Sequence, residues 1–200
     1  MHKEIRICPI CGRMLNIKEG HLECSKCGEH FVYDSKCRVW RNPNIIDISY
    51  ADPNSAVLST LFPHKFTLKT AYGMKKYNSI AGFLLTICWP GADIGIYDEL
   101  ARLSGLDAVK ARTVLPNWRE TQSVTWNRKV IGRNSNEYQE MLKYVFDEVF
   151  EQSHLFRLAI MKSRGKILMN VDGETDRSKT LITSEEFLSL LNRQRDKIIL

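Results

Sequence analysis

The sequence Cys8-Pro-Ile-Cys11-Gly12, followed by Cys24-Ser-Lys-Cys27-Gly28, decides the fold of the amino-terminal segment. A Cys-x2-Cys turn lets two sulfurs reach one ion, and the glycine after each pair accommodates the tight turn. Four thiolates complete a tetrahedral zinc site and leave no position for water, so we expect a structural rather than a catalytic ion. A segment this small has little core and needs the metal to fold.

The residues around the two cysteine pairs predict a small β-structure. Residues 13–23 are typical of a hairpin that turns at Glu19 and Gly20, and a third short strand is expected at 31–33. The polar residues 34–44 form a connector. We therefore expect a zinc ribbon over residues 1–42 and a second domain over residues 45–200. The remaining thiols are interpreted as a spare cysteine, Cys37, and a core cysteine, Cys88.

Composition and charge limit the class of protein. Hydrophobic residues make up 44% and charged residues 26% of the 200 residues, which is ordinary for a globular chain. No run approaches the roughly 18 apolar residues that a membrane span needs. No secretory signal is recognisable at the amino terminus, so we expect a cytoplasmic protein without a membrane partner.

The net charge of +6 leaves a nucleic-acid partner open. Residues 1–42 hold eight Lys and Arg against five Asp and Glu, so the positive excess is densest in the ribbon. A solvated surface is the more common explanation of such an excess. If the ribbon binds nucleic acid, its cations would contact phosphates and Trp40 would stack on a base. The candidate cations are Arg6, Arg13, Lys18, Lys26, Arg38 and Arg41.

Residues 45–200 predict a mainly helical α+β domain with few strands. Apolar spacing and stop signals indicate strands at 45–50, 66–68 and 166–171. Helices are expected at 76–88, 93–103, 107–115, 135–151 and 154–161, and a last helix begins at Thr183 or Ser184 and ends near Asp196.

Several motifs follow one another in this domain. They are Leu58-Ser-Thr-Leu-Phe-Pro-His-Lys-Phe66, Tyr77-Asn-Ser-Ile-Ala-Gly-Phe-Leu84, Trp118, Trp126, Arg133-Asn-Ser-Asn-Glu-Tyr138, Leu168-Met-Asn-Val-Asp-Gly-Glu-Thr-Asp176, Leu181-Ile-Thr-Ser-Glu-Glu-Phe187 and Leu191-Asn-Arg-Gln-Arg195. In this order they resemble the NADAR family of NAD- and ADP-ribose-associated N-glycosidases, in its divergent bacterial and phage branches, over roughly residues 48–196. The resemblance implies a compact domain with one cleft that cleaves an N-glycosidic bond to ribose.

Three positions depart from the family pattern. Thr60 stands at the opening asparagine, Ala81 at the expected catalytic glutamate and Cys88 at a lysine. Alanine cannot carry a proton, so this departure predicts impaired chemistry. One hypothesis is therefore a protein that binds an ADP-ribose-like nucleotide or a modified base without efficient turnover. A second is a working N-glycosidase whose acid has moved, with Asp93, Asp98 or Asp176 as candidates. A third is a ribbon module for nucleic acid or protein without catalysis.

The matched positions also give candidate ligand contacts. Phe62 and Tyr72 would line the pocket, and Trp118 and Trp126 would stack on a base. Asp172 or Asp176 would bind ribose hydroxyls, and Arg133 would reach a phosphate. Each has an ordinary alternative: packing for the tryptophans, a turn for Asp172, and a solvated charge for Arg133. His64 is a further catalytic candidate.

Overall fold

The computed structural model describes residues 7–8, 10–18, 21–34, 39–89, 93–112 and 118–198. The chain divides into two compact units. Unit 1 comprises Met1–Ile46 with Gly165–Leu168, and unit 2 comprises Asp47–Arg164 with Met169–Leu200. Strands β5 (Ile45–Asp47) and β10 (Ile167–Met169) form a two-stranded sheet.

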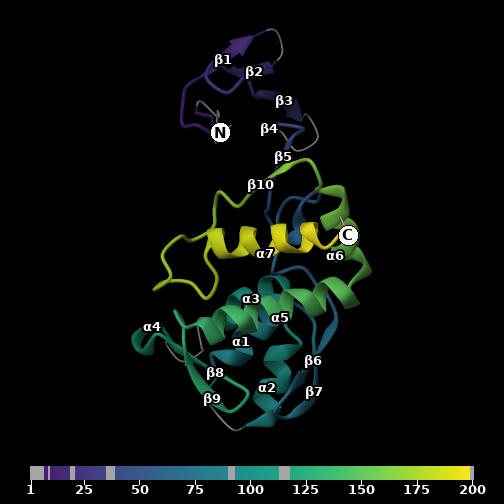
Figure 1. Ribbon diagram of the computed structural model, residues 1–200, viewed down its shortest axis with the longest axis vertical. Helices are drawn as coiled ribbons and strands as arrows, with labels where there is room; N and C mark the ends of the chain where they lie inside the picture. Colours follow the sequence, from purple (N-terminus) through teal and green to yellow (C-terminus); the bar gives the residue numbers. More distant parts are fainter. Residues whose placement is uncertain are drawn as a thin grey trace. The chain divides into compact units, whose positions relative to one another are not determined.

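Unit 1 is built on a four-stranded antiparallel sheet in the order β1-β2-β3-β4 (Figure 1). Its strands are β1 (Leu15–Lys18), β2 (His21–Cys24), β3 (His30–Asp34) and β4 (Val39–Arg41). Leu15, Leu22 and Phe31 are buried with Cys8 and Cys24 in one small cluster. The predicted hairpin and third strand are confirmed. Strand β4 was not predicted, because it lies in a segment whose polar composition indicates a connector.

Unit 2 is mainly helical, as the sequence predicts (Figure 1). Its helices are α1 (Ile80–Ile87), α2 (Ile94–Ala101), α3 (Gly105–Ala111), α4 (Trp118–Thr121), α5 (Asn136–Gln152), α6 (His154–Lys162) and α7 (Ser184–Asp196), with a short 3-10 helix at Ala56–Leu58. Helix α5 lies at the centre and packs against α6, α7 and the strand β6 (Phe66–Thr70). Its buried face includes Tyr138, Leu142, Val145 and Phe146. These residues recur at helical spacing and produce a continuous apolar stripe.

Two hairpins in unit 2 differ from the sequence-based prediction. Strand β6 pairs with β7 (Gly73–Tyr77), and β8 (Ser123–Trp126) pairs with β9 (Lys129–Gly132). The helix expected over 76–88 is therefore shorter, because residues 73–77 complete the first hairpin. The second hairpin turns at Asn127 and Arg128, which both have positive φ. Such turns usually carry glycine at the second position, and Arg128 hides that signal.

Helix α7 begins with a complete capping box. The side chain of Thr183 accepts a hydrogen bond from the amide of Glu186, and the Glu186 carboxylate accepts one from the amide of Thr183. Two of the amides at a helix start are thereby satisfied within four residues. The start predicted at Thr183 or Ser184 is confirmed, with Thr183 as the cap. Among the described residues, no helix combines the length and the apolar character needed to cross a membrane.

Candidate functional site

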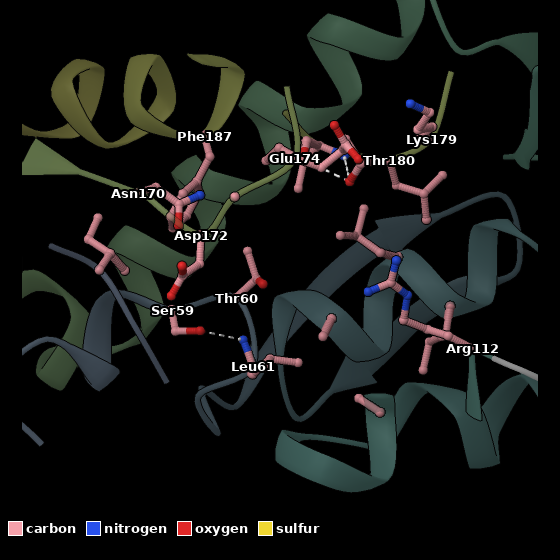
Figure 2. Close-up of a pocket in the computed structure, with 18 of the residues that line it drawn as sticks. Ser59, Thr60, Leu61, Arg112, Asn170, Asp172, Glu174, Lys179, Thr180 and Phe187 are labelled. Atoms are coloured by element: carbon pink, nitrogen blue, oxygen red, sulfur yellow. Dashed lines mark hydrogen bonds between the residues drawn. The ribbon is translucent and has the colours of Figure 1, made fainter. Parts of the chain in front are cut away.

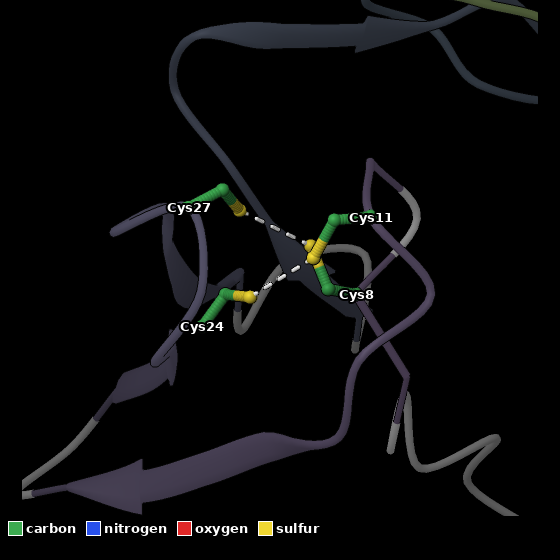
Figure 3. A group of neighbouring side chains, drawn as sticks. All are labelled: Cys8, Cys11, Cys24 and Cys27. Atoms are coloured by element: carbon green, nitrogen blue, oxygen red, sulfur yellow. Dashed lines mark hydrogen bonds between the residues drawn. The ribbon is translucent and has the colours of Figure 1, made fainter.

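Unit 1 brings the four predicted cysteines together (Figure 3). The sulfurs of Cys8, Cys11, Cys24 and Cys27 all lie within 4.8 Å of one another. The Cys8–Cys27 and Cys11–Cys24 sulfur pairs are 3.6 and 3.3 Å apart. A tetrahedral site with metal–sulfur bonds of about 2.3 Å has sulfurs about 3.8 Å apart. The four thiols therefore fit one metal ion with only small side-chain adjustments.

Two glycines shape the turns of the knuckles, and backbone amides favour a thiolate at Cys24. Gly12 and Gly28 have φ of 70° and 71°, a left-handed conformation that favours glycine. Each closes a turn by donating its amide to the carbonyl of the first cysteine of its pair, at 2.9 Å for Cys8 and 2.8 Å for Cys24. Hydrogen bonds from the backbone amides of Cys27 and Lys26 lower the pKa of Cys24 to about 6. This sulfur is therefore ready to bind a cation as a thiolate at neutral pH.

Unit 2 contains a cleft of about 630 Å³ (Figure 2). Ser59, Thr60 and Leu61 line it from the loop before β6, Ala81 from α1, and Ala108 and Arg112 from the segment around α3. The loop between β10 and α7 contributes most of the remaining lining residues: Asn170, Asp172, Gly173, Glu174, Lys179, Thr180, Leu181 and Ile182. The volume falls in the range of roughly 300–1,000 Å³ that is typical of small-molecule sites.

The loop with Thr60 is fixed to two helices. The amide of Ala81 donates to the carbonyl of Thr60 at 2.9 Å, and the amide of Gly105 donates to the carbonyl of Leu61 at 2.8 Å. Two positions that depart from the NADAR pattern, Thr60 and Ala81, are therefore in direct contact and line one cleft. Neither supplies an ionisable group.

Asp172 brings a carboxylate to this cleft from another segment. Figure 2 shows its side chain directed toward Ser59 and Thr60. Asp172 is exposed, and the described part of the chain offers its carboxylate no hydrogen-bond or ion-pair partner. Such a group can accept a proton or bind a hydroxyl of a ligand without first breaking a bond to the protein.

The turn that carries Asp172 is held by α7. The amide of Gly173 donates to the carbonyl of Asn170, and the Ser184 hydroxyl donates to the same carbonyl. A Cβ added to Gly173 would lie 2.0 Å from the Ser184 Oγ and 2.2 Å from the Asn170 amide nitrogen. Glycine is therefore required here by the close approach of the neighbouring side chains, and it fixes the position of Asp172.

Glu174 is a second acid in the cleft, with a different environment. Its Oε1 accepts hydrogen bonds from the amides of Thr175 and Asp176 at 2.9 and 3.0 Å. The amides of Asp176 and Thr175 lower the pKa of Glu174, so it remains ionised. Asp172 is the better candidate for proton transfer, because Glu174 already uses one of its oxygens within its own loop.

Cations lie in the same cleft, away from Asp172. Arg112, Arg119 and Lys179 all line it, and Figure 2 shows Arg112 and Lys179 at the end opposite Asp172. Arg119 donates from Nε to the carbonyl of Lys179 at 3.0 Å, and Lys179 forms an ion pair with Asp176 at 3.2 Å. Arg112 is exposed and has no hydrogen-bond or ion-pair partner among the residues the structure describes. Asp172 therefore lies at one end of the cleft and Arg112 and Lys179 at the other, with Glu174 beside Thr180.

A smaller cavity of about 160 Å³ contains other predicted residues. Tyr72, Trp126 and Asp93 line it together with Trp89 and Tyr97. Asp93 accepts hydrogen bonds from the amides of Gly95 and Ile96 and caps α2. The prediction that Tyr72 and Trp126 share one pocket with Asp172 is wrong, because these residues line two different cavities.

Four further candidates line neither cavity. Phe62 packs against His64, with ring centroids 4.9 Å apart. Trp118 is half-buried, and the Arg119 guanidinium lies 5.9 Å from the centroid of the Trp118 ring. Asp98 forms an ion pair with Lys75 at 2.9 Å. Asp176 accepts hydrogen bonds from the amide and the hydroxyl of Ser178, so its carboxylate stabilises the loop that carries it.

His64 has a structural position. Its side chain is buried, and its Nε2 donates to the carbonyl of Val57 at 2.7 Å, so Nδ1 accepts from the Ser153 hydroxyl at 2.8 Å. Burial lowers the pKa of His64 and keeps it neutral. Both nitrogens are used within the protein. Cys88 is a core thiol as expected, and burial raises its pKa to about 12.

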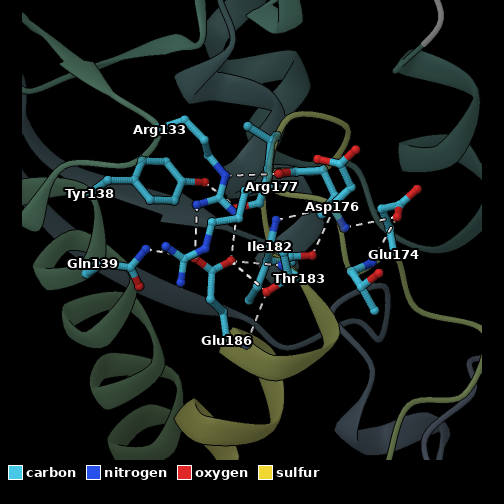
Figure 4. A network of polar contacts seen from close by, with 12 residues as sticks. Arg133, Tyr138, Gln139, Glu174, Asp176, Arg177, Ile182, Thr183 and Glu186 are labelled. Carbon is cyan, nitrogen blue, oxygen red and sulfur yellow. Dashed lines mark hydrogen bonds and ion pairs between the residues drawn. The ribbon is translucent and has the colours of Figure 1, made fainter.

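Arg133 departs most from its predicted role (Figure 4). It is fully buried, and its Nη1 donates to the Glu186 Oε1 at 3.0 Å in a two-pronged ion pair. Its Nε donates to the carbonyl of Thr180 at 2.9 Å, and its guanidinium lies 4.7 Å from the ring centroid of Tyr138. The expected phosphate contact is therefore replaced by an internal one, which joins the start of α5 to the start of α7.

Three residues of the cleft are not among the predicted site residues: Arg112, Lys179 and Glu174. Their positions in the cleft depend on how distant loops meet, and no local spacing indicates this. Of the ribbon cations, Arg13 and Lys26 are exposed. Arg6, Arg38 and Cys37 lie outside the described residues, as do the side chains of Lys18 and Trp40.

We compared the chain with family models, curated proteins and solved structures. No curated protein and no solved structure matches the chain. A family model described as bacteriophage protein GP30.3 matches residues 53–196, which cover most of unit 2 and well over half of the chain. The chain therefore belongs to the bacteriophage protein GP30.3 family.

Proposed function

We propose that the cleft of unit 2 binds an ADP-ribose-type nucleotide and hydrolyses its N-glycosidic bond, with Asp172 as the carboxylate. The observation that carries the proposal is that Asp172 lines the same cleft as Ala81, the position where the NADAR-like pattern expects a glutamate. A carboxylate from another segment can restore the proton acceptor that alanine cannot provide.

The charges of the cleft support this ligand class. Arg112, Arg119 and Lys179 would hold a diphosphate through charge-assisted hydrogen bonds. At the opposite end, Asp172 and the hydroxyls of Ser59 and Thr60 would contact a ribose. A ligand with two phosphates at one end and a sugar at the other matches this separation. A fully cationic or a fully apolar ligand would leave one end of the cleft unpaired.

The proposed reaction is a simple hydrolysis. The bond between the ribose C1′ and the nitrogen of the base breaks, and its electron pair leaves with the nitrogen. Water adds to C1′ and Asp172 takes a proton from this water. The departing nitrogen takes up a proton from solvent, and Asp172 then returns its proton to solvent, so that no net proton is consumed. An oxocarbenium-like transition state is stabilised by a nearby negative charge, which Asp172 would supply.

The test uses DNA that carries ADP-ribose on guanine. The purified full chain should release ADP-ribose, detected by liquid chromatography, in a time-dependent manner. Binding of added ADP-ribose without any release from the modified DNA would instead leave the protein a nucleotide-binding protein. Absence of both binding and release at millimolar ligand would remove the proposal.

We also propose that the ion of unit 1 is zinc. Four thiolates at the observed separations suit a tetrahedral d10 ion with no open coordination position, which is a structural role. Metal analysis of the purified chain by mass spectrometry should give zinc in at least equimolar amount, and iron instead of zinc would contradict the choice.

A nucleic-acid role for unit 1 is the second candidate function. Arg13 directly follows one knuckle, Lys26 lies within the other, and both are exposed. Charge reversal of these two residues in the full chain should weaken salt-sensitive binding to DNA or RNA, measured by fluorescence anisotropy. Unchanged binding would exclude the two knuckles as the contact surface.

A further inference from the structure

A second group of metal-ligand side chains lies on the sheet of unit 1. One imidazole nitrogen each of His21 and His30 and one carboxylate oxygen of Glu23 all lie within 4.8 Å of one another. None of the three takes part in the four-cysteine site, which is already complete. The group is therefore a separate feature of the ribbon.

The strand register explains why these three side chains meet. His21 and Glu23 are two residues apart on β2 and so project from the same face. Glu23 is paired directly with His30 on β3. The alternate residues Leu22 and Phe31 are also paired and are buried in the core cluster with the cysteines. The three polar side chains consequently share the opposite face of the sheet.

The geometry of the rings favours convergence on one point. The His21 and His30 ring centroids are 5.3 Å apart, and the ring planes are inclined by 53°. Parallel stacking would turn the ring nitrogens away from a shared centre, whereas inclined rings can direct one nitrogen each toward the same ion. His21 and Glu23 are half-buried, so the sheet limits their rotamers, and His30 is exposed.

We propose that His21, Glu23 and His30 form a second metal site, which binds a divalent ion such as Zn²⁺ through two imidazoles and one carboxylate. Zinc bonds to histidine nitrogen and carboxylate oxygen are about 2.0–2.2 Å long, which places neighbouring ligand atoms about 3.4 Å apart. Small rotations of three side chains reach this arrangement from the observed separations. A fourth position remains for water or a ligand atom, in contrast to the closed four-cysteine site.

This site would have a distinct chemical character. Nitrogen and oxygen donors select borderline divalent ions, whereas four thiolates select softer ones. One ion bound to β2 and β3 would join the two strands on the face opposite the cysteine-containing core. The two sites should therefore fill in order, with the four-cysteine site first.

Zinc stoichiometry of the full chain tests the proposal. Titration of metal-free protein with Zn²⁺ by calorimetry should give two equivalents, a tight first and a weaker second. His30→Ala and Glu23→Gln should each lose the second equivalent, with affinity lowered more than about tenfold because one of three ligands is removed. His154→Ala removes an exposed imidazole on α6 that belongs to neither cluster, and should keep both equivalents.

A thiol-reactivity assay checks that the variants fold. In each zinc-loaded variant, the four cysteines should remain protected from a thiol reagent, which shows that the first site is intact. Loss of the second equivalent together with this protection supports the proposal. A single equivalent in the wild-type chain, or two equivalents retained in His30→Ala, would overturn it.

Discussion

Replacement of Glu186 by glutamine should destabilise unit 2 by about 3 kcal/mol at neutral pH. Glu186 is only 6% exposed, and its partner Arg133 is completely buried. Burial alone would raise the pKa of the Glu186 carboxyl, but hydrogen bonds from Arg133, Thr183 and Gln139 lower it from 4.5 to about 2. A pKa lowered to this extent corresponds to about 3 kcal/mol of stabilisation. Glutamine keeps the size and the capping geometry but leaves the Arg133 charge buried without a counter-ion.

The sign of the pH dependence follows from the direction of the shift. Because the pKa of Glu186 is lower in the folded state, its contribution is complete above about pH 4.5. The contribution is lost as the pH falls toward about 2, where the folded carboxyl takes up its proton. The stability difference between the wild type and Glu186→Gln should therefore shrink in acid.

Urea unfolding followed by helical circular dichroism measures this effect, because all described helices lie in unit 2. The matched control is Glu185→Gln, which removes an exposed charge one residue away on the same helix. The control should change the free energy of unfolding by less than about 0.5 kcal/mol. A loss below about 1 kcal/mol for Glu186→Gln, or an equal loss at pH 3 and pH 7, would refute the reasoning.

Three other perturbations test the cleft and the ribbon. Asp172→Asn should slow ADP-ribose release from modified DNA more than about a hundredfold, because an amide cannot accept the proton. The control Asp107→Asn lies outside the cleft and should leave the rate unchanged. Similar rates for both variants would exclude Asp172 as the proton acceptor. Gly173→Ala should cost about 1–3 kcal/mol in urea unfolding and weaken ADP-ribose binding, because its Cβ would clash with Ser184, whereas Gly132→Ala has open space and should be mild. Chelation of the four-cysteine metal should abolish the strand signal of unit 1 and spare the helical signal of unit 2; a strand signal that persists without metal would show that the ion is dispensable.

The features predicted well from the sequence are those encoded locally. Four cysteines in two short turns can meet only around a small common centre, and their sulfurs do so. The apolar spacing in residues 135–151 similarly identifies α5, because Tyr138, Leu142 and Val145 recur on one helical face. Neither inference requires knowledge of distant contacts.

The features that were missed depend on distant partners. Arg133 looks like a solvated or ligand-binding cation in the sequence, and only Glu186, 53 residues later, makes it a buried one. Glu174 and Arg112 likewise line the cleft with Ala81 only because segments far apart in the chain meet there. The β8–β9 hairpin was missed for a local reason, since Arg128 occupies a turn position where glycine would normally mark the turn.

The most direct test of the account is calorimetric titration of the full chain with ADP-ribose, in parallel with Arg112→Ala and Arg102→Ala. Arg112 lines the cleft without a partner among the described residues, so it is expected to meet a phosphate. We predict that the wild type binds and that Arg112→Ala binds about tenfold or more weakly. Arg102→Ala, which removes an exposed arginine outside the cleft, should bind like the wild type. No detectable binding by the wild type, or equal affinities for all three proteins, would contradict this prediction.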